Sequence, residues 1–597
     1  MENSIGIDFG STYSTFASYD PETKELRCFD LVQGESSAIP STVTVSLKKK
    51  VWDFGHAAKS VVGNKTQRVF EHFKMLLAEK NEDILCRRGY DSEYTPAKIA
   101  QFYLQSSLNM ISSDEGMEFR DIVVCTPENW GKKTGKYMDG RGVLKEILSV
   151  DKNGVSLPRN VRVVTEPEAA SAYFAYKYEE VTGRAFNGHL LLIDYGGGTL
   201  DLTLTKVESD GKGSMNIRYV DSGGAGENHE EEGQITIGNA GVAYMQDILV
   251  SAMRSQGLLE EGEAPDYNAP DFKKAVKELE NKIKGNSKLI RDRFDDYSLY
   301  SHVEEILDED PEDDDSFFTD IDYDEGLDIT YQQLFLSYRK IIQEVLAKEI
   351  TKINQTIINK LGKNPCEPTE AGDEDFKIAL VGGFSNFNLV QKQIKEVYNI
   401  AADDINDGRM SHIDRNTKEL AVALGAALIA GGRVDLKRVA RYSIGMRVSR
   451  GVDPVTGKER DAVRYGIHMG DCMEPGEIGY CRYKDYDRGD PDGRVVFMNV
   501  SAQDALVINR TGKAGNHVKM PMRQSMIRKI RQKLEPFNSD QPRNWFIGFS
   551  FDDSSIIVFH VTDADDPTVT IEIPLARFSD LFESNVDVKE NRLIEEE

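Results

Sequence analysis

The chain has 597 residues, with 73 Lys and Arg against 100 Asp and Glu and a formal net charge of −27. Its length corresponds to about four domains, and its acidic balance disfavours non-specific binding to nucleic acid or to an anionic membrane surface. Hydrophobic residues make up 40% of the chain and no apolar run has the length of a membrane-spanning helix, which excludes such a span and general disorder. The chain starts without a basic and apolar leader, so we expect a cytoplasmic protein with no nucleic-acid and no membrane partner.

The six cysteines are spread along the whole sequence. None belongs to a C-x-x-C pair or to a cluster with histidine, so they indicate buried free thiols rather than a zinc site or a disulfide framework. The sequence also lacks a G-x-x-x-x-G-K-[ST] motif and an H-E-x-x-H motif, which excludes P-loop nucleotide binding and the metalloprotease helix. The cysteines are Cys28, Cys86, Cys125, Cys366, Cys472 and Cys481.

The first informative segment is a hairpin pattern that occurs twice. Residues 5–16 form a predicted hydrophobic strand that contains Asp8, then a turn at Gly10 and a returning strand. Residues 192–204 repeat this order with Asp194 and a turn of three glycines. An internal echo of this kind predicts two similar structural units.

Strands and helices alternate between and after the two hairpins. The predicted strands cover residues 121–125, 161–164 and 378–381, and the predicted helices cover residues 97–110, 167–178, 330–361 and 418–430. The helix at 330–361 has capping-box spacing between Thr330 and Gln333, and Gly362 and Pro365 end it. The alternation predicts an α/β fold.

One segment carries 14 acidic residues and no Lys or Arg, at residues 304–328. Such a composition predicts a solvated loop or a sheet edge. The functional alternative is an acidic arm that regulates access or docks on a basic helix.

The composition changes near Gly431, where the helical signal gives way to short alternating segments. Predicted strands cover residues 442–448, 495–500, 545–551, 556–561 and 568–573, and the last three predict an antiparallel meander in a β-sandwich. The exception is residues 519–534, where apolar residues four apart and six Lys and Arg predict a basic amphipathic helix. We interpret it as a helix lying on the sandwich, with a peptide, membrane or acidic-partner contact as the alternative.

Both hairpin turns have the composition of a phosphate-binding loop. Consecutive backbone N–H groups in a glycine turn bind phosphate oxygens without a side-chain charge, and an aspartate can hold Mg²⁺ through water. The residues assigned to these roles are Asp8, Gly10, Ser11 and Thr12 in the first hairpin and Asp194, Gly196, Gly197, Gly198, Thr199 and Asp201 in the second. Two facing hairpins of this kind can clamp one polyphosphate.

Five segments, in order, resemble the motifs of a known family. The two hairpins resemble the paired phosphate motifs of the actin-like ATPase superfamily, and the chain as a whole most resembles the seventy-kilodalton heat-shock chaperone family (heat shock protein 70). Residues 165–170 are similar to that family's first connecting motif, residues 380–385 to its adenosine motif, and residues 421–427 to its second connecting helix. The resemblance covers residues 4 to about 432.

The resemblance implies a nucleotide cleft between two ribonuclease-H-like lobes that binds ATP or ADP with Mg²⁺. The implied domains are a nucleotide-binding domain at residues 1–432 (lobe I about 1–185, lobe II about 186–405, a return helix to 432), a β-rich, sandwich-like substrate-binding domain at 433–585, and an acidic tail at 586–597.

The resemblance also implies roles for individual residues. The implied catalytic residues are Lys74, Glu166, Thr199 and Asp201, and the residues that hold Mg²⁺ through water are Asp8 and Asp194. The implied nucleotide contacts are Gly10, Ser11, Thr12, Tyr13, Gly196, Gly197, Gly198, Glu280, Lys284, Ser287, Gly382, Gly383 and Ser385. Lys74 would neutralise charge on the γ-phosphate, and Glu166 would sense that phosphate.

The function that the resemblance implies is slow ATP hydrolysis that controls the binding of an unfolded or extended polypeptide by the β domain. Two departures from the family predict a divergent, lidless member. Residues 434–439 lack the leucines that couple nucleotide state to substrate release, and only 22 residues follow Leu575, too few for the helical lid. The alternatives are a nucleotide-gated actin-like scaffold without chaperone activity and, less favoured, a small-metabolite kinase of the same fold.

Overall fold

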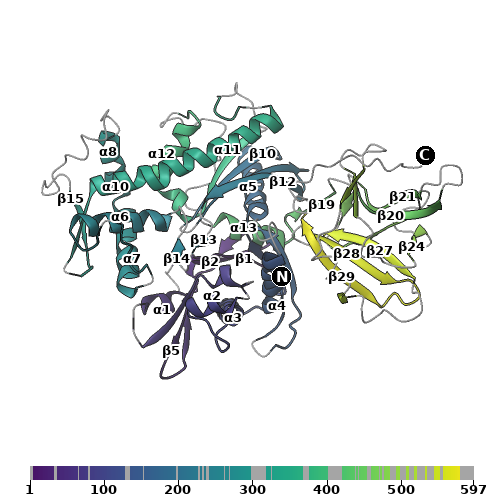
Figure 1. Cartoon of the computed structure of the whole chain (residues 1–597), viewed down its shortest axis with the longest axis horizontal. Helices are drawn as coiled ribbons and strands as arrows, with labels where there is room; N and C mark the ends of the chain where they lie inside the picture. The colour runs from purple at the N-terminus through teal and green to yellow at the C-terminus, as the bar shows by residue number, and fades with distance from the viewer. Residues whose placement is uncertain are drawn as a thin grey trace. The chain divides into compact units, whose positions relative to one another are not determined.

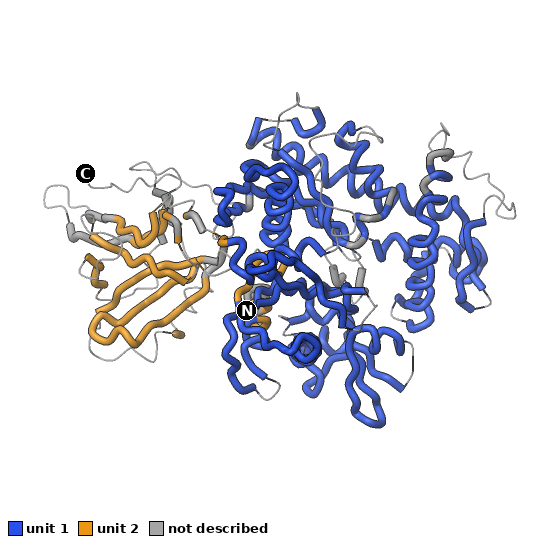
Figure 2. Tube along the Cα trace, turned by 180° about the vertical axis from the view of Figure 1, so that it is seen from behind, with its two compact units in different colours: residues 1–125, 145–161, 166–434 blue, residues 126–144, 162–165, 435–597 orange. Residues whose placement is uncertain are grey.

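The computed structural model of the chain (Figure 1) contains two compact units (Figure 2). Unit 1 consists of residues 1–125, 145–161 and 166–434, and unit 2 of residues 126–144, 162–165 and 435–597. In the described part of the chain, no helix is both long and apolar enough to cross a membrane. The structure describes residues 4–31, 36–62, 64, 66–77, 79, 81–127, 135–151, 154–196, 199–225, 229–231, 234–236, 241–260, 262–267, 269–297, 317–324, 326–362, 364–367, 376–400, 420–436, 438–440, 443–452, 459–468, 471–473, 476–483, 493–497, 506–509, 517–520, 532–533, 544–551 and 556–577.

The first sheet of unit 1 carries the first hairpin. It contains β3, β2, β1 and β8 in that order, with antiparallel β1–β2 and β2–β3 pairs and a parallel β1–β8 pair. The central strand β1 is largely buried on both faces: Ile5, Ile7 and Phe9 are buried on one face, and Gly6 on the other lies against helix backbone at residues 423–427. These strands are β1 (Ser4–Phe9), β2 (Tyr13–Tyr19), β3 (Leu26–Cys28) and β8 (Asp121–Thr126).

The second sheet of unit 1 repeats this arrangement. It contains β12, β11, β10 and β17 in that order, with antiparallel β11–β12 and β10–β11 pairs and a parallel β10–β17 pair. Its strands are β10 (Asn187–Tyr195), β11 (Leu200–Ser209), β12 (Ser214–Ala225) and β17 (Phe376–Val381). The prediction of an α/β fold is therefore confirmed, and the two sheets have matching order and strand direction.

The two hairpins also have the same register. In the first, Phe9 pairs with Ser14 and leaves residues 10–13 as the loop. In the second, Tyr195 pairs with Leu200 and leaves residues 196–199 as the loop. The internal echo that the sequence predicts is thus present in the backbone pairing.

Two small-residue helices, α5 (Glu166–Thr182) and α13 (Ala421–Ala430), join the sheets. A Cβ atom at Gly6 of β1 would lie 2.2 Å from a backbone nitrogen of α13, and a Cβ atom at Gly425 of α13 would lie 1.8 Å from a backbone oxygen of α5. Helix α5 in turn packs on β10, β11 and β12. These contacts need glycine because only its missing side chain lets the backbones approach so closely.

The predicted long helix is present as three consecutive segments, α10 (Tyr331–Ser337), a π-helical turn η3 (Tyr338–Gln343) and α11 (Glu344–Leu361). The capping box at Thr330 is formed, and Gly362 ends the helix with a φ of 67°. The sequence predicts this helix and both its ends, whereas the π-helical turn inside it has no sequence signal that we identified.

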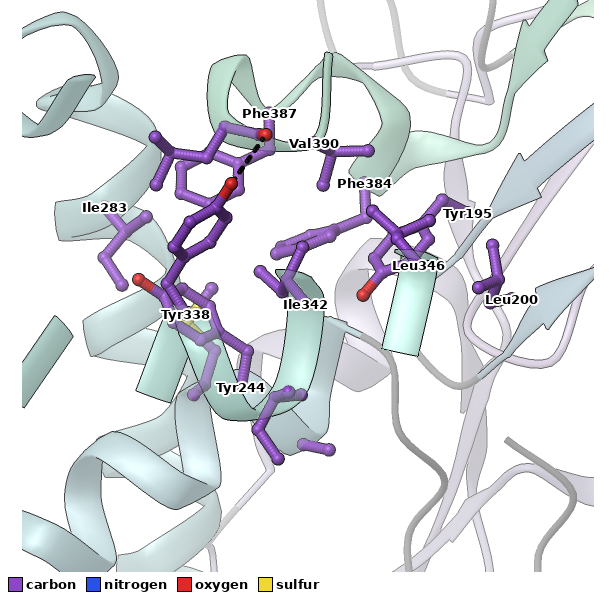
Figure 3. Packing of buried hydrophobic residues seen from close by; sticks show 14 of the residues in the cluster. Tyr195, Leu200, Tyr244, Ile283, Tyr338, Ile342, Leu346, Phe384, Phe387 and Val390 are labelled. Carbon is purple, nitrogen blue, oxygen red and sulfur yellow. Dashed lines mark hydrogen bonds between the residues drawn. The ribbon is translucent and has the colours of Figure 1, made fainter. Parts of the chain in front are cut away.

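One hydrophobic cluster of unit 1 includes residues of the second sheet and of this long helix (Figure 3). Tyr195 at the end of β10 stacks on Phe384, with ring centroids 5.3 Å apart and an interplanar angle of 27°. Ile342 and Leu346 of the helix belong to the same cluster. The packing of Tyr195 therefore fixes the end of β10 directly after Asp194.

The remaining described elements up to residue 434 are shorter strands and helices. Strands β6, β5 and β7 form a three-stranded sheet, and β4 pairs with β2. The predicted strand at 161–164 and the helix at 97–110 are confirmed within β9 and α3. The elements are β4 (Ile39–Pro40), β5 (Thr42–Ser46), β6 (Trp52–Phe54), α1 (Gly55–Ser60), β7 (Gln67–Glu71), η1 (Phe73–Leu76), α2 (Glu82–Arg87), α3 (Pro96–Glu115), α4 (Gly135–Ser149), β9 (Asn160–Thr165), β13 (His229–Glu231), β14 (Gln234–Thr236), α6 (Gly241–Ser255), α7 (Pro270–Gly285), α8 (Ser287–Tyr297), η4 (Gly383–Asn386) and α12 (Asn388–Val397).

The end of the acidic segment is a two-stranded hairpin, which agrees with the sheet-edge alternative predicted for residues 304–328 and not with the loop. Strands β15 (Phe317–Ile321) and β16 (Leu327–Thr330) pair antiparallel. Ile321 and Leu327 are buried while Asp320 and Asp328 face outward, so the alternation of apolar and acidic residues decides the structure. Residues 304–316 lie outside the described residues.

The described part of unit 2 contains two larger antiparallel sheets and the two-stranded β19–β22 sheet, while β18 continues the second sheet beside β12. One larger sheet has the order β21–β20–β25–β26, and the other has the order β23–β27–β28–β29 with β24 also paired to β27. Side chains from both, including Ile444 of β20 and Phe549 of β27, belong to one hydrophobic core. The predicted meander of the last three strands is confirmed. The strands are β18 (Asp435–Leu436), β19 (Arg438–Val439), β20 (Ser443–Val452), β21 (Glu459–Ile467), β22 (Cys472–Met473), β23 (Gly479–Tyr480), β24 (Val496–Phe497), β25 (Leu506–Asn509), β26 (His517–Met520), β27 (Trp545–Phe551), β28 (Ile556–Asp563) and β29 (Thr570–Arg577).

The start of the predicted basic helix at 519–534 is wrong. Lys519 and Met520 belong to strand β26, where they pair with Val507 and Leu506 of β25. The sequence from His517 alternates in polarity for four residues, and pairing with β25 wins over the helical spacing that begins at the same place. Residues 521–531, 534 and the acidic tail at 586–597 lie outside the described residues.

Candidate nucleotide-binding site

The first loop, residues 10–13, is held tightly from one side. Ser41, between β4 and β5, donates its hydroxyl to the Gly10 carbonyl at 2.7 Å and its backbone N–H to the Thr12 carbonyl at 2.8 Å. A Cβ atom at Gly10 would lie 1.9 Å from the Tyr13 carbonyl oxygen, so the turn requires glycine there. Ser11 and Thr12 are half-buried and Tyr13 is 40% exposed.

Two backbone bonds are present at the described ends of the second loop, Gly196 and Thr199. The Gly196 N–H donates to the Thr199 carbonyl at 2.9 Å, and the N–H of Gly241, the first residue of α6, donates to the Gly196 carbonyl at 3.3 Å. Thr199 and Asp201 are exposed at the rim, and Asp201 pairs with Asp194 in the hairpin register. The predicted contacts Gly197 and Gly198 lie outside the described residues.

The turn after β17 lies directly against Asp194. A Cβ atom at Gly382 would lie 2.2 Å from Oδ1 of Asp194, and Gly382 has a φ of 84°. Ser385 is fully buried and donates its hydroxyl to the Gly382 carbonyl at 2.7 Å, so it stabilises this turn from within. The role of Gly382 beside Asp194 is not apparent from the sequence motif alone, although the parallel pairing of Asp194 with Val381 brings the two together.

A buried ion pair joins the short helix η1 to the start of helix α5. Lys74 of η1 donates from Nζ to Oε1 of Glu166, the first residue of α5, at 2.6 Å. The Lys74 side chain is 4% exposed and the Glu166 side chain 19%. Lys74 was expected on sequence grounds near the γ-phosphate, and the structure brings it into the same electrostatic cluster as Asp8 and Asp194.

The carboxylates of this cluster outnumber its lysine. Burial and the charge of Glu166 raise the pKa of Asp8 to about 7, against the opposing effect of Lys74. Burial, followed by Glu166, Asp201 and Asp8, raises the pKa of Asp194 well above its usual value. Burial alone would lower the pKa of Lys74, but the charges of Glu166 and Asp8 outweigh it and raise that pKa. The cluster therefore has a deficit of positive charge.

This deficit of positive charge bears on whether the site can hold Mg²⁺. Asp8 and Asp194 are hard oxygen donors, and a divalent cation retaining its water shell would supply the missing positive charge. Across the described residues, no set of three or more His, Cys, Asp or Glu is arranged to hold a metal ion directly. The donor chemistry fits a hydrated Mg²⁺ held by Asp8 and Asp194.

The predicted adenine contacts lie on a different pair of elements. Glu280 and Lys284 belong to α7, and Ser287 begins α8. Lys284 Nζ lies 2.8 Å from Oε1 of Glu280, an i,i+4 pair whose side chains are 60% and 32% exposed. The structure thus groups Asp8, Lys74, Glu166, Asp194 and Asp201 electrostatically, while contact of nucleotide with α7, Gly382, Gly383 or Ser385 stays a prediction.

Ser41 is the residue of this site that the sequence analysis did not identify. It is 2% exposed and its hydroxyl also lies 2.8 Å from that of Ser14, which is fully buried. No phosphate motif includes Ser41, and only its position directly after Pro40, which pairs with Tyr13, places it beside the loop. A prediction of the β2–β4 pairing would have been needed to find it.

No protein-family model matches the chain. Among curated proteins, the heat shock cognate 70 kDa protein 3 of Dictyostelium discoideum is 24% identical over 34% of this chain and 34% of its own length. A heat shock 70 kDa protein of Trichophyton rubrum is 23% identical over 35% of this chain and 32% of its own. A heat shock cognate HSP70 protein of Trypanosoma brucei brucei is 25% identical over 34% of this chain and 31% of its own length.

The matched region spans about a third of the length of these relatives. The chain is therefore distantly related to the seventy-kilodalton heat-shock proteins.

Proposed function

We propose that the chain binds ATP with Mg²⁺, hydrolyses it slowly, and uses the nucleotide state to control polypeptide binding by the C-terminal β-rich domain at residues 433–585. The observation that carries this proposal is the electrostatic cluster of Asp8 and Asp194, each near the turn of a hairpin with the same register, with Lys74 of η1 and Glu166 of α5. The distant relationship to heat-shock proteins supports it. In this proposal the two matched sheets are ribonuclease-H-like lobes on either side of the nucleotide.

The loops would bind the phosphates through their backbone N–H groups. Gly10 leaves room for the tight first loop, and its neighbours Ser11 and Thr12 add hydroxyl donors. Gly196 begins the second loop, which Thr199 closes. Asp8 and Asp194 would hold the water shell of Mg²⁺, which when bound supplies positive charge at the phosphate oxygens.

Hydrolysis needs an attacking water, a neutralised γ-phosphate and a departing phosphate. A water oxygen bonds to the γ-phosphorus as the bond to the β–γ bridging oxygen breaks, and the water proton passes to a carboxylate or to solvent. Thr199 and Asp201 lie at the rim where they can orient that water. Lys74 would neutralise the γ-phosphate, and slow turnover is expected because Glu166 already engages its ammonium group at 2.6 Å.

The other end of the nucleotide is proposed to extend toward α7 and the turn after β17. Glu280, Lys284 and Ser287 would contact the adenine, and the backbone at Gly382 and Gly383 with Ser385 would border the adenosine. Since Ser385 donates its hydroxyl to Gly382, its contribution would be to hold that turn.

The C-terminal β-rich domain at residues 433–585 is proposed to be the polypeptide-binding part, and the compartment is proposed to be the cytoplasm. Its two antiparallel sheets share one core, as expected for a sandwich. An extended polypeptide could add to a free strand edge by backbone hydrogen bonds. The outer strand β29 contains Pro574, which lacks an N–H donor, so β29 is a poor edge for such pairing.

Calorimetric titration with ATP, with and without Mg²⁺, tests the nucleotide part of the proposal. We expect stoichiometric binding that Mg²⁺ strengthens, and loss of the Mg²⁺ effect in Asp8→Asn. Exposed Asp210→Asn is a suitable control because Asp210 lies in the turn after β11, at the opposite end of that strand from the loop. Absence of ATP binding by the unaltered protein would refute the proposal.

Turnover measured with and without a chemically unfolded protein tests the chaperone part. Stimulation by the unfolded protein supports it. A flat response combined with nucleotide-dependent sedimentation would favour an actin-like scaffold, and ADP release stimulated by a small metabolite would favour a kinase.

A further inference from the structure

Ser41 holds the first phosphate loop through two separate bonds. It is the single residue between strands β4 and β5. Its side chain donates to the Gly10 carbonyl and its backbone N–H donates to the Thr12 carbonyl, at 2.7 and 2.8 Å. One residue therefore fixes two of the four loop carbonyls.

The direction of these bonds determines where the loop's N–H groups point. The peptide bonds of the described chain are trans, and in a trans peptide the N–H of the next residue points opposite to the carbonyl. With the carbonyls of Gly10 and Thr12 turned toward Ser41, the N–H groups of Ser11 and Tyr13 point away from it. Two donors then face the same side of the loop, the arrangement that binds an anion.

The Ser41 hydroxyl is itself oriented by a buried network. A serine has one O–H donor, so when Ser41 donates to Gly10, the 2.8 Å bond to Ser14 must have Ser14 as its donor. The hydroxyl of Tyr103, on α3, interacts with both serines and donates to the Ile39 carbonyl at 3.2 Å. Ser14, Ser41 and Tyr103 are each at most 2% exposed, so water does not compete for these bonds.

We propose that Ser41 is the positioning residue of the phosphate-binding loop, setting affinity for the phosphates of the nucleotide rather than for its base. The inference rests on the proposed function and adds to it a residue that contacts no ligand. Ser41 acts through the backbone of Gly10 and Thr12, because it lies on the side of the loop opposite to the N–H groups.

Three variants test the role of Ser41. Ser41→Ala removes the hydroxyl bond to Gly10, and Ser41→Cys keeps the shape with a weaker donor. Ser107→Ala is the matched control because Ser107, also fully buried, donates its hydroxyl at 2.9 Å to the Tyr103 carbonyl, within helix α3 and away from the loop. Dissociation constants for ATP, ADP and adenosine are measured by calorimetry, and folding is followed by thermal unfolding.

A loss that depends on phosphate is the expected result. Ser41→Ala should weaken ATP and ADP binding about tenfold, the effect of one preorganising hydrogen bond, while adenosine binding stays unchanged. Ser41→Cys should give an intermediate loss, and it carries the test if Ser41→Ala fails to fold. Ser107→Ala should lower the melting temperature without changing the ratio of ATP to adenosine affinity.

The outcomes separate this inference from the proposed function. If the unaltered protein binds no ATP, both are overturned. If it binds ATP and a folded Ser41 variant binds it equally well, or loses adenosine and ATP affinity to the same extent, only the positioning role of Ser41 is overturned.

Discussion

The two hairpins have the same register and the same aspartate, yet different contacts hold their loops. The first loop depends on the side chain and N–H of Ser41 and on the absence of a side chain at Gly10. At the described ends of the second loop, the contacts are backbone bonds from Gly196 and Gly241, and a Cβ atom at Gly196 would lie an ordinary 3.5 Å from the Thr199 carbonyl oxygen. A repeated motif can therefore conserve geometry while differing in which residues maintain it.

The largest expected difference between the hairpins is at their first glycines. Gly10→Ala places Cβ 1.9 Å from the Tyr13 carbonyl oxygen, so the loop must move by more than 1 Å. We expect ATP affinity to fall about a hundredfold, the effect of misplacing a site by that distance. Gly196→Ala should lose little. Calorimetry on both variants measures this, and equal losses would show that the loops are equivalent.

The ion pair between Lys74 and Glu166 gives the next largest effect. Lys74→Met leaves buried carboxylates without their cation and should lower the free energy of unfolding by about 3 kcal/mol. Lys74→Met combined with Glu166→Gln removes both charges, so stability should largely return while hydrolysis stays lost. Urea unfolding and turnover together distinguish the two roles, and restored turnover in the double variant would exclude Lys74 from catalysis.

The sequence predicts the hairpins well because their information is local. Alternating apolar residues, an aspartate and a glycine turn lie within about a dozen residues, and the strand pairing follows from them. The pairing of Lys74 with Glu166 joins residues 92 apart in the chain, and only family resemblance placed them together. Ser41 was missed because its contact needs the long-range pairing of β2 with β4.

The sequence is ambiguous where two local signals compete. High negative charge predicts a loop or a sheet edge up to residue 328, and the buried alternation of Thr319, Ile321, Leu327 and Ile329 decides for the β15–β16 hairpin. Lys519 and Met520 fit both the helical spacing and the strand alternation, and pairing with β25 decides for the strand. Charge and spacing describe a segment alone, whereas its neighbours determine which face is buried.

Gly382→Ala tests whether the second hairpin's aspartate depends on the neighbouring turn. The new Cβ would lie 2.2 Å from Oδ1 of Asp194, and the φ of 84° adds strain. We expect about a tenfold weaker Mg²⁺ dependence of ATP binding because Asp194 must move. Gly362→Ala is the control, since Gly362 has a φ of 67° but, apart from its chain neighbours, no atom of the described residues lies within 4 Å of its Cβ position. Similar Mg²⁺ titrations for both variants would contradict this role.

Thr199→Ala and Thr12→Ala should separate the tasks of the two loops. Thr199 is exposed at the rim of the second loop, so its loss should slow hydrolysis about tenfold by freeing the attacking water, with ATP affinity unchanged. Thr12→Ala, in the first loop, should instead weaken affinity. Single-turnover rates and dissociation constants measure the two effects, and a fall in affinity without a slower rate for Thr199→Ala would reverse the assignment.

The smallest effect is expected outside both hairpins, in unit 2, where His560 is 3% exposed. Its Nε2 lies 2.7 Å from the Ser550 hydroxyl, and its Nδ1 lies 3.6 Å from Oε1 of Glu572, an exposed side chain. Burial lowers the pKa of His560 below its usual 6.5, against the weaker opposing effect of Glu572. The folded state therefore binds fewer protons than the unfolded state near that pH.

Stability of unit 2 should consequently fall as the pH drops below about 6.5, because protonation of His560 favours the unfolded chain. His560→Gln removes the titrating group, so its free energy of unfolding should depend less steeply on pH between about 5 and 6.5. The ATP affinity of His560→Gln at pH 7 should equal that of the unaltered protein, because His560 lies outside both hairpins. Urea unfolding followed by tryptophan fluorescence measures the pH dependence, and an equally steep curve for His560→Gln would mean that other groups cause it.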